Sequence, residues 1–125
     1  MKQDSRLLGA WGEAQTAAFL RQKGYVIRAA NYRTRQGEID LIAEGHGLLV
    51  SVEVKTRRST AFSQPREAVT PKKLARMRLA ALAYLAETNC TLPARFDVAE
   101  VFAPEQLTQP PKAFHYLENV AEFDS

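Results

Sequence analysis

The sequence predicts an α/β fold with a mixed β-sheet, in the order helix, three strands, helix, and one or two further strands. Three observations support this class. The first segment repeats apolar residues at helical spacing, a glycine-containing turn joins two apolar strand-like segments, and a second helical segment precedes the last strands. Because strands joined by a long helical crossover can lie parallel, we expect a mixed sheet in two or three layers.

The composition is that of one ordinary globular domain. The chain has 125 residues, of which 46% are hydrophobic and 25% charged, so residues 1–125 are expected to form one domain with a core over about 5–118 and an acidic C-terminal tail over 119–125. No apolar run approaches the roughly 20 residues of a membrane helix, and no signal peptide is evident. Cys90 has neither a disulfide partner nor a zinc-binding neighbour. A cytoplasmic protein that does not enter a membrane is expected.

The first helix is expected over residues 5–22. Four residues at spacings of four, three and four predict its buried stripe: Leu7, Trp11, Ala14 and Ala18. Gly24 is placed to end the helix as a C-cap. A strand over residues 25–33 should follow.

The next two strands are expected to form a hairpin over residues 38–43 and 48–55. The turn between them contains Gly45-His46-Gly47, a strong hairpin signal, and the return strand is rich in β-branched residues. If the loop consists of His46 and Gly47 alone, Ala43 pairs with Val50.

A second helix is expected after a polar loop over residues 57–69. Thr70 suits the N-cap, Pro71 suits the first helical position, and Asn89 is the expected stop. The apolar stripe of this helix is predicted at Leu74, Met77, Ala81 and Leu85. Later strands are expected over residues 95–102 and 114–117.

The same hairpin register places Asp40 opposite Glu53. Directly opposed residues in an antiparallel pair have Cβ atoms roughly 4.5–5.5 Å apart. Two carboxylates so close, within apolar strands, repel each other and lose solvation. A divalent cation such as Mg²⁺ would compensate, because it binds carboxylate oxygens and retains waters for substrate phosphates.

Strand alternation places Lys55 on the face that carries Glu53. From there its ammonium group could orient or help to deprotonate a water and stabilise charge that develops on a phosphate. The chemistry predicted from these residues is phosphodiester hydrolysis. The alternative is a cross-strand salt bridge, in which Lys55 neutralises Glu53 or Asp40 on a solvated sheet face.

Basic residues are concentrated in the middle of the chain. Between Lys55 and Arg78 there are eight basic residues and one acid, Glu67, although the net charge of the whole chain is only +3. This distribution favours a face for a polyanion over a solvated helix face and loop. The residues expected to contact nucleic-acid phosphates are Arg57, Arg58, Arg66, Lys72, Lys73 and Arg76. Lys72 and Lys73 also oppose the dipole of the second helix, which an anionic partner would relieve.

Two segments together resemble the signature of the YraN family. They are Gly37-Glu38-Ile39-Asp40-Leu41-Ile42 and Val52-Glu53-Val54-Lys55-Thr56-Arg57. Further matches are Gly9, Gly12-Glu13, Asn31, Lys73 and Arg95-Phe96-Asp97, so the resemblance spans about residues 9 to 120. That family is grouped with the PD-(D/E)XK nucleases, near the Holliday junction resolvases. Ile39 replaces the proline for which the nuclease motif is named.

The resemblance implies a restriction-endonuclease-like core in the order αβββαβ. It implies Asp40 and Glu53 as ligands of Mg²⁺ or Mn²⁺, with the carbonyl of Val54 as a third ligand. It also implies Lys55 as the catalytic lysine and Glu13 as an additional catalytic acid. DNA is the implied partner, and a homodimer is compatible because related resolvases commonly work as dimers.

Other acids and polar residues near this constellation have two interpretations each. Glu13 lies in line with apolar residues of its helix and is either part of the acid set or a boundary glutamate paired to an arginine. In a regular strand Glu38 lies on the same face as Asp40. It either positions a metal-bound water or is a solvated acid at the strand end. Gln64 resembles a polar residue that some of these nucleases use near the metal, but it is more simply a loop residue. The leading hypothesis is a metal-dependent DNA endonuclease, the second a non-catalytic DNA-binding protein with the same fold, and the third a structural or interaction protein.

Overall fold

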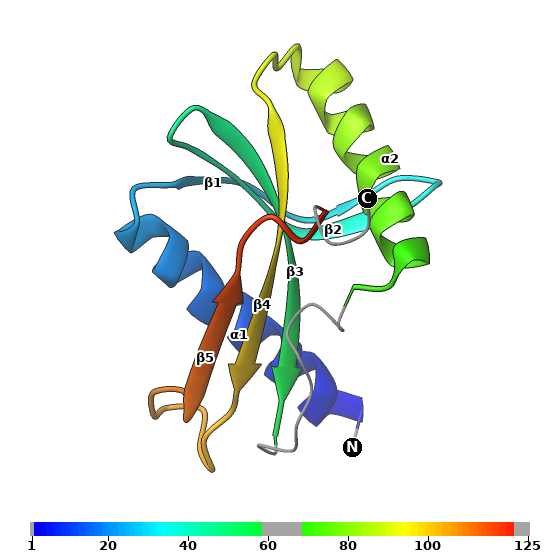
Figure 1. Cartoon of the computed structure of the whole chain (residues 1–125). Coiled ribbons are helices and arrows are strands. Elements are labelled where there is room, and N and C mark those ends of the chain that lie inside the picture. Colours follow the sequence, from blue (N-terminus) through cyan, green and yellow to red (C-terminus); the bar gives the residue numbers. More distant parts are fainter. Residues whose placement is uncertain (1, 59–68, 122–125) are drawn as a thin grey trace.

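A computed structural model describes residues 2–58 and 69–121, with side chains from residue 5 onward. Its helices and strands are α1 (Lys2–Gln22), β1 (Val26–Arg33), β2 (Glu38–Gly45), β3 (Leu48–Arg57), α2 (Pro71–Thr88), β4 (Ala94–Phe102) and β5 (Ala113–Leu117). The strands form a five-stranded sheet in the order β1-β2-β3-β4-β5 (Figure 1). Only the β3–β4 pair, joined through α2, is parallel. The predicted α/β class and mixed sheet are confirmed.

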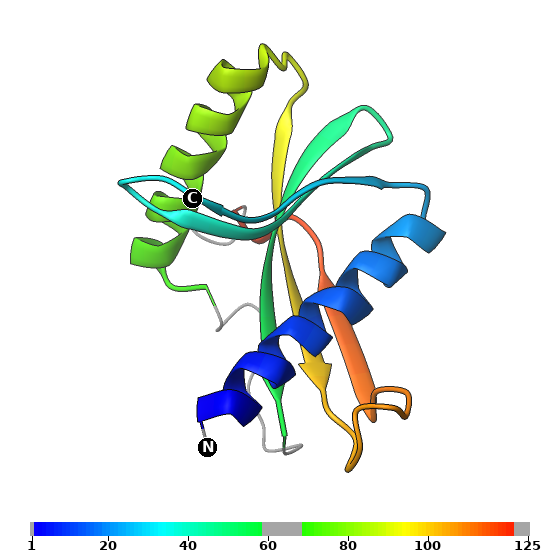
Figure 2. The same ribbon diagram turned by 180° about the vertical axis from the view of Figure 1, so that it is seen from behind.

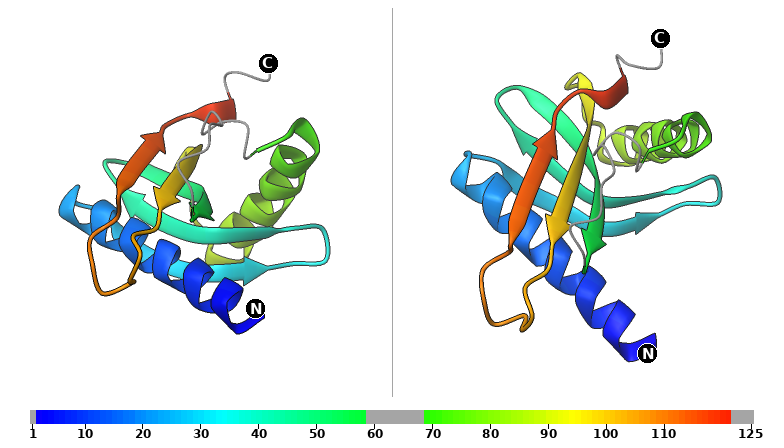
Figure 3. Two further views of the ribbon diagram at one scale, coloured as in Figure 1. Left: turned by 90° about the horizontal axis from the view of Figure 1, so that it is seen from below. Right: turned by 60° about the horizontal axis from the view of Figure 1, so that its bottom comes forward.

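The two helices cover opposite faces of the sheet, so the fold has three layers. Figure 2 shows α1 crossing in front of the strands, and Figure 3 shows α2 on the other side. Alternate sheet residues belong to two separate hydrophobic cores. Ile42 and Val98 pack with α2, whereas Ala43 and Ala99 pack with α1. Neither helix in the described ranges is both long and apolar enough to span a bilayer.

The face that α1 presents to the sheet differs from the predicted one. Leu7 is 63% exposed, and Ala14 and Ala18 are exposed as well. The helix instead buries Gly12, Thr16, Ala17 and Leu20. The predicted stripe was wrong because α1 is rich in alanine, so more than one line of residues has helical apolar spacing. Packing at short range selected the face with small residues.

The β2–β3 hairpin has the predicted register. Ala43 pairs with Val50, and His46 and Gly47 form the two-residue loop. Both loop residues have positive φ, 53° and 76°, as a type I′ turn requires. The ladder ends one pair short of Asp40, however, at Leu41 opposite Val52.

Helix α2 begins and ends where its local chemistry predicted. The Thr70 hydroxyl accepts a hydrogen bond from the Lys73 backbone N–H at 3.1 Å, and Pro71 occupies the first turn. Asn89 ends the helix in the left-handed region, with φ 53°. The buried side chains are Leu74, Met77, Ala80 and Ala81, and Leu85 packs at the edge of the same core. This placement brings the first turn of α2 to the β2–β3 region.

Candidate functional site

Asp40 and Glu53 lie side by side where the β2–β3 ladder ends. The Oδ2 atom of Asp40 accepts a hydrogen bond from the Val54 backbone N–H at 2.8 Å, and Glu53 is 7% exposed. The Asp40 side chain therefore bonds a strand amide at the position where the backbone ladder stops. The sequence-based register brought these two residues together correctly, although it did not predict this hydrogen bond.

The environment of this pair disfavours two negative charges. Burial raises the pKa of Glu53, the negative charge of Asp40 raises it further, and the result is a pKa of about 7. Burial also raises the pKa of Asp40, opposed by the hydrogen bond from Val54 and by the charge of Lys73. The interaction between the two carboxyls lowers the pKa of Asp40 and raises that of Glu53, so Glu53 is the more readily protonated of the pair. A cation beside them would relieve this repulsion.

Lys73 provides one such cation. Its Nζ atom, in the first turn of α2, forms an ion pair with Oε2 of Glu53. The sequence suggested that an anion would relieve the unfavourable position of Lys73 at the helix start, and Glu53 is an anion in that position. Sequence reasoning assigned Lys73 to nucleic acid and missed this contact, because the pairing depends on how α2 packs over the sheet.

Glu13 and Glu38 surround the pair at longer range. Oε1 of Glu13 accepts a hydrogen bond from Asn31 Nδ2 at 3.1 Å. Burial raises the pKa of Glu13, the Asn31 hydrogen bond lowers it, and the charges of Asp40 and Glu38 raise it. Glu38 is exposed and forms an ion pair with Arg33 at 3.2 Å. Both acids therefore add negative potential at Asp40, and the partner of Glu13 is an amide rather than an arginine.

Lys55 lies beside this site but is not paired within it. Its side chain is exposed, and it lines a groove of about 260 Å³ with Glu13, Val54 and Thr56. Among the described residues, Lys55 forms no ion pair, and the predicted alternative of a salt bridge to Glu53 or Asp40 is absent. Lys73 neutralises Glu53 instead, which leaves the Lys55 ammonium group available at the groove.

A close approach of α1 to β3 positions Glu13. A Cβ atom on Gly12 would lie 1.8 Å from Oγ1 and 3.0 Å from Cβ of Thr56. Only glycine therefore allows α1 to lie this close to the end of β3. The contact brings Glu13 toward Asp40 and to the same groove as Lys55.

The other predicted phosphate-contacting residues are distributed differently. Arg57 forms an ion pair with Glu100, whose side chain is fully buried. Arg58, Lys72 and Arg76 are exposed. Arg66, like Gln64, lies outside the described residues. Arg57 thus has a structural partner, whereas the exposed members of the set face solvent.

A second buried acid, Asp97, was quoted from the sequence only as part of the family resemblance. Its carboxylate accepts hydrogen bonds from Arg95 Nη2 at 2.9 Å, from the Tyr116 hydroxyl at 2.6 Å and from the Asn119 backbone N–H at 2.9 Å. Burial raises the pKa of Tyr116, and the Asp97 charge raises it further. This cluster links β4 to β5 and to the segment after it. An acid inside an apolar strand was the only sequence signal for it.

The donor set suits a cation that also takes ligands from solvent or substrate. Within residues 2–58 and 69–121, no three His, Cys, Asp or Glu side chains lie close enough together to hold a metal ion. Asp40 and Glu53 supply two carboxylates, and Mg²⁺ typically binds one or two carboxylates and keeps several waters. The residues present therefore fit such an ion without a dedicated protein cage.

The fold and this pair define an α/β protein with two interacting carboxylates and flanking lysines at the centre of a mixed sheet. The chain belongs to the family described as uncharacterised protein family UPF0102, whose sequence profile matches residues 12–101. It is 47% identical to a UPF0102 protein of Syntrophomonas wolfei over 81% of this chain and 89% of that one. It is 51% identical to a UPF0102 protein of Symbiobacterium thermophilum, over 78% and 83% of the two chains. A UPF0102 protein of Alkaliphilus metalliredigens is 40% identical over 92% and 97%.

Proposed function

We propose that this protein is a Mg²⁺- or Mn²⁺-dependent endonuclease that hydrolyses phosphodiester bonds in DNA, with branched or structured DNA as the substrate class to test first. The observation that carries the proposal is the Asp40–Glu53 pair, whose pKa values are both raised by burial. Clustered acids with strongly perturbed pKa values are typical of functional sites. Lysines on two sides of the pair supply positive charge that suits a phosphate.

In this proposal Asp40 and Glu53 hold the metal, with the Val54 carbonyl as a third protein ligand. When bound, the ion polarises the phosphoryl group and lowers the pKa of a bound water. Lys55, exposed at the neighbouring groove, orients the attacking water and stabilises negative charge on the phosphate. Glu13 completes the acid set from α1. It accepts a proton more readily than an ordinary glutamate, because burial and nearby acids raise its pKa.

The test is a cleavage panel across linear, single-stranded, flapped and four-way junction DNA, with Mg²⁺ or Mn²⁺ and with EDTA. Asp40→Ala and Lys55→Ala should each lower metal-dependent cleavage by about 100-fold or more, because each removes a group that acts on the reacting phosphate. Glu105→Gln and Lys112→Ala are matched controls, since both residues are exposed and lie in the loop between β4 and β5. Circular dichroism should show that all four variants are folded. Equal cleavage by wild type and both site variants would refute the catalytic assignment.

A second candidate function is DNA binding without turnover. The ion pair between Lys73 and Glu53 favours it, because an ammonium group already compensates one of the two carboxylates. Calorimetric titration with Mn²⁺ separates the two functions. If the protein is an endonuclease, the wild type should bind the metal and Asp40→Ala should lose that binding. If the protein only binds DNA, neither result is expected. Retention on DNA with no metal binding would select the second function.

A further inference from the structure

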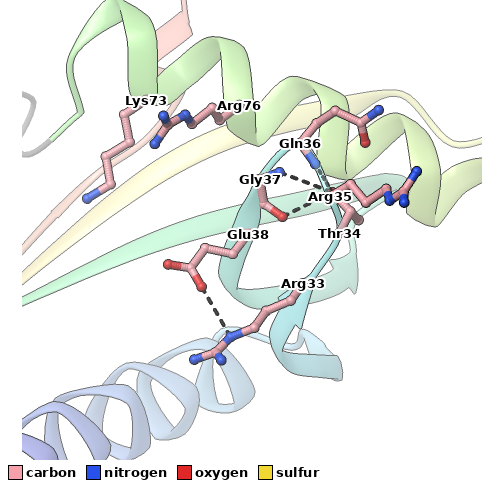
Figure 4. Close-up of a pocket in the computed structure, with 8 residues that line it drawn as sticks. All are labelled: Arg33, Thr34, Arg35, Gln36, Gly37, Glu38, Lys73 and Arg76. Carbon is pink, nitrogen blue, oxygen red and sulfur yellow. Dashed lines mark hydrogen bonds and ion pairs between the residues drawn. The ribbon is translucent and has the colours of Figure 1, made fainter.

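A polar groove lies next to the carboxylate pair, between the turn that joins β1 to β2 and the first half of α2. Its volume is about 480 Å³. It is lined by Arg33, Thr34, Arg35, Gln36, Gly37, Glu38, Lys73 and Arg76 (Figure 4). Lys73 and Arg76 extend from α2, and the other side chains come from the turn and the strand ends that flank it (Figure 4). Arg33 and Arg35 were not among the residues that the sequence assigned to nucleic acid.

The groove carries an excess of positive charge. Its lining includes four cationic side chains and one acid, Glu38. Glu38 pairs with Arg33, but the two side chains are 63% and 74% exposed, and such pairs contribute little to stability. Among the described residues, Arg35 and Arg76 have no acidic partner within ion-pair distance. Two arginines are thus available for an anion, and a third can be released at low cost.

The turn that carries Arg35 is held in place. The Thr34 hydroxyl accepts hydrogen bonds from the backbone N–H groups of Gln36 and Gly37 at 3.2 and 3.1 Å. The Thr34 N–H donates to the Gly37 carbonyl at 2.8 Å. A Cβ atom on Gly37 would lie 2.4 Å from the carbonyl oxygen of Arg76, so the turn packs directly on the α2 backbone. Little backbone conformational entropy would be lost when a ligand engages the two sides.

We propose that this groove binds the phosphate backbone of the nucleic acid that the carboxylate pair acts on, with Arg35 and Arg76 as its phosphate contacts. The inference rests on the proposed function for the choice of polyanion. Lys73 lines the groove and forms an ion pair with Glu53, so this side chain links the groove to the carboxylate pair. A polymer with repeated phosphates can occupy both places at once, whereas a free phosphate cannot. Arginine also suits phosphate geometry, since its guanidinium group can donate two parallel hydrogen bonds.

The test measures binding in the absence of cleavage. Fluorescence anisotropy of labelled duplex and junction DNA in EDTA would be recorded across a salt series for wild type, Arg35→Ala, Arg76→Ala and the double variant. Phosphate contacts release counterions, so each lost contact should make the plot of log K against log salt less steep by about 0.9. The double variant should bind about tenfold more weakly at low salt, with the same loss for all sequences.

Arg21→Ala/Arg78→Ala is the matched control, because both arginines are exposed on helices and neither lines the groove. It removes the same net charge and should leave most of the affinity and the salt slope intact. Equal weakening by the control and the groove variant would overturn the groove assignment, as would a wild type that binds polyglutamate but not DNA. Cleavage is scored separately. Groove-dependent binding without cleavage under any metal would support this groove while refuting the endonuclease.

Discussion

Two buried acids of this protein have different environments and therefore different roles. Asp97 is fully buried and accepts hydrogen bonds from a guanidinium group, a phenol and a backbone amide. Glu53 is nearly as buried, but its neighbours are a second carboxylate and one lysine. Removing a buried charge from its donors is costly to the fold, whereas a charge opposed by a like charge is suited to bind a cation. Asp97 is thus a structural acid and Glu53 a candidate ligand.

Asp97→Asn should lower the free energy of unfolding by about 3 kcal/mol, because the largely buried Arg95 guanidinium loses its closest anion and keeps only the 3.7 Å contact with exposed Glu118. Urea denaturation followed by circular dichroism measures the change. Glu105→Gln, at an exposed position, is the control and should change stability by less than about 0.5 kcal/mol. If Asp97→Asn is as stable as this control, the cluster does not stabilise the link between β4 and β5.

Two glycines of α1 have opposite surroundings. Gly12 is buried against Thr56, and a Cβ atom there would overlap the threonine side chain. Gly9, one turn earlier in the same helix, has no atom within 4 Å of an added Cβ. Helix propensity favours alanine over glycine equally at both positions, so any difference between them reports the contact with β3.

Gly9→Ala should raise the free energy of unfolding by about 0.5–1 kcal/mol. Gly12→Ala should lower it by about 1–3 kcal/mol, because rotation of Thr56 cannot move the Cβ atom that lies 3.0 Å away. Thermal and urea unfolding of the two variants measure both changes. Stabilisation by Gly12→Ala would show that α1 does not approach β3 as closely as the structure places it.

The candidate site draws on both helices and on two strands of the sheet. Helix α1 contributes Glu13, β2 contributes Asp40, β3 contributes Glu53 and Lys55, and α2 contributes Lys73. The three layers meet at the end of the β2–β3 ladder, where each supplies charge. A ligand that bridges the carboxylates would therefore stabilise the whole domain against unfolding.

Addition of Mn²⁺ should raise the melting temperature of the wild type, and EDTA should reverse the shift. A metal present at 100 times its Kd stabilises the folded state by about 2.7 kcal/mol. Glu53→Gln should lose most of the shift, because it removes one of the two carboxylates, while Glu105→Gln should keep it. Differential scanning fluorimetry across a metal series measures the shifts. Equal shifts in Glu53→Gln and wild type would place the metal elsewhere.

Several elements followed from local chemistry. The positive φ values of the His46–Gly47 loop follow from its glycine and set the register that brings Asp40 beside Glu53. The start of α2 follows from Thr70 and Pro71. In each case a few neighbouring residues determine the backbone conformation, so the sequence is sufficient to predict it.

Other features depended on contacts between distant segments. Periodicity could not select the face of α1, because an alanine-rich helix has several apolar lines, and the Gly12–Thr56 contact selects one. Alternation along β3 placed Lys55 on the face of Glu53 and left open a salt bridge to Glu53 or Asp40, but the structure pairs Glu53 with Lys73. That choice follows from the distance at which α2 packs over the sheet.

The order of residues in the chain was therefore enough to determine the α/β class, the hairpin register and the two adjacent carboxylates. The tertiary structure alone decided which lysine neutralises Glu53, which acids reach Asp40, and which arginines line the neighbouring groove. The physical reason is one of range. Turn and cap energies act over a few residues along the chain, whereas charge interactions at this site act through space between elements that only packing brings together.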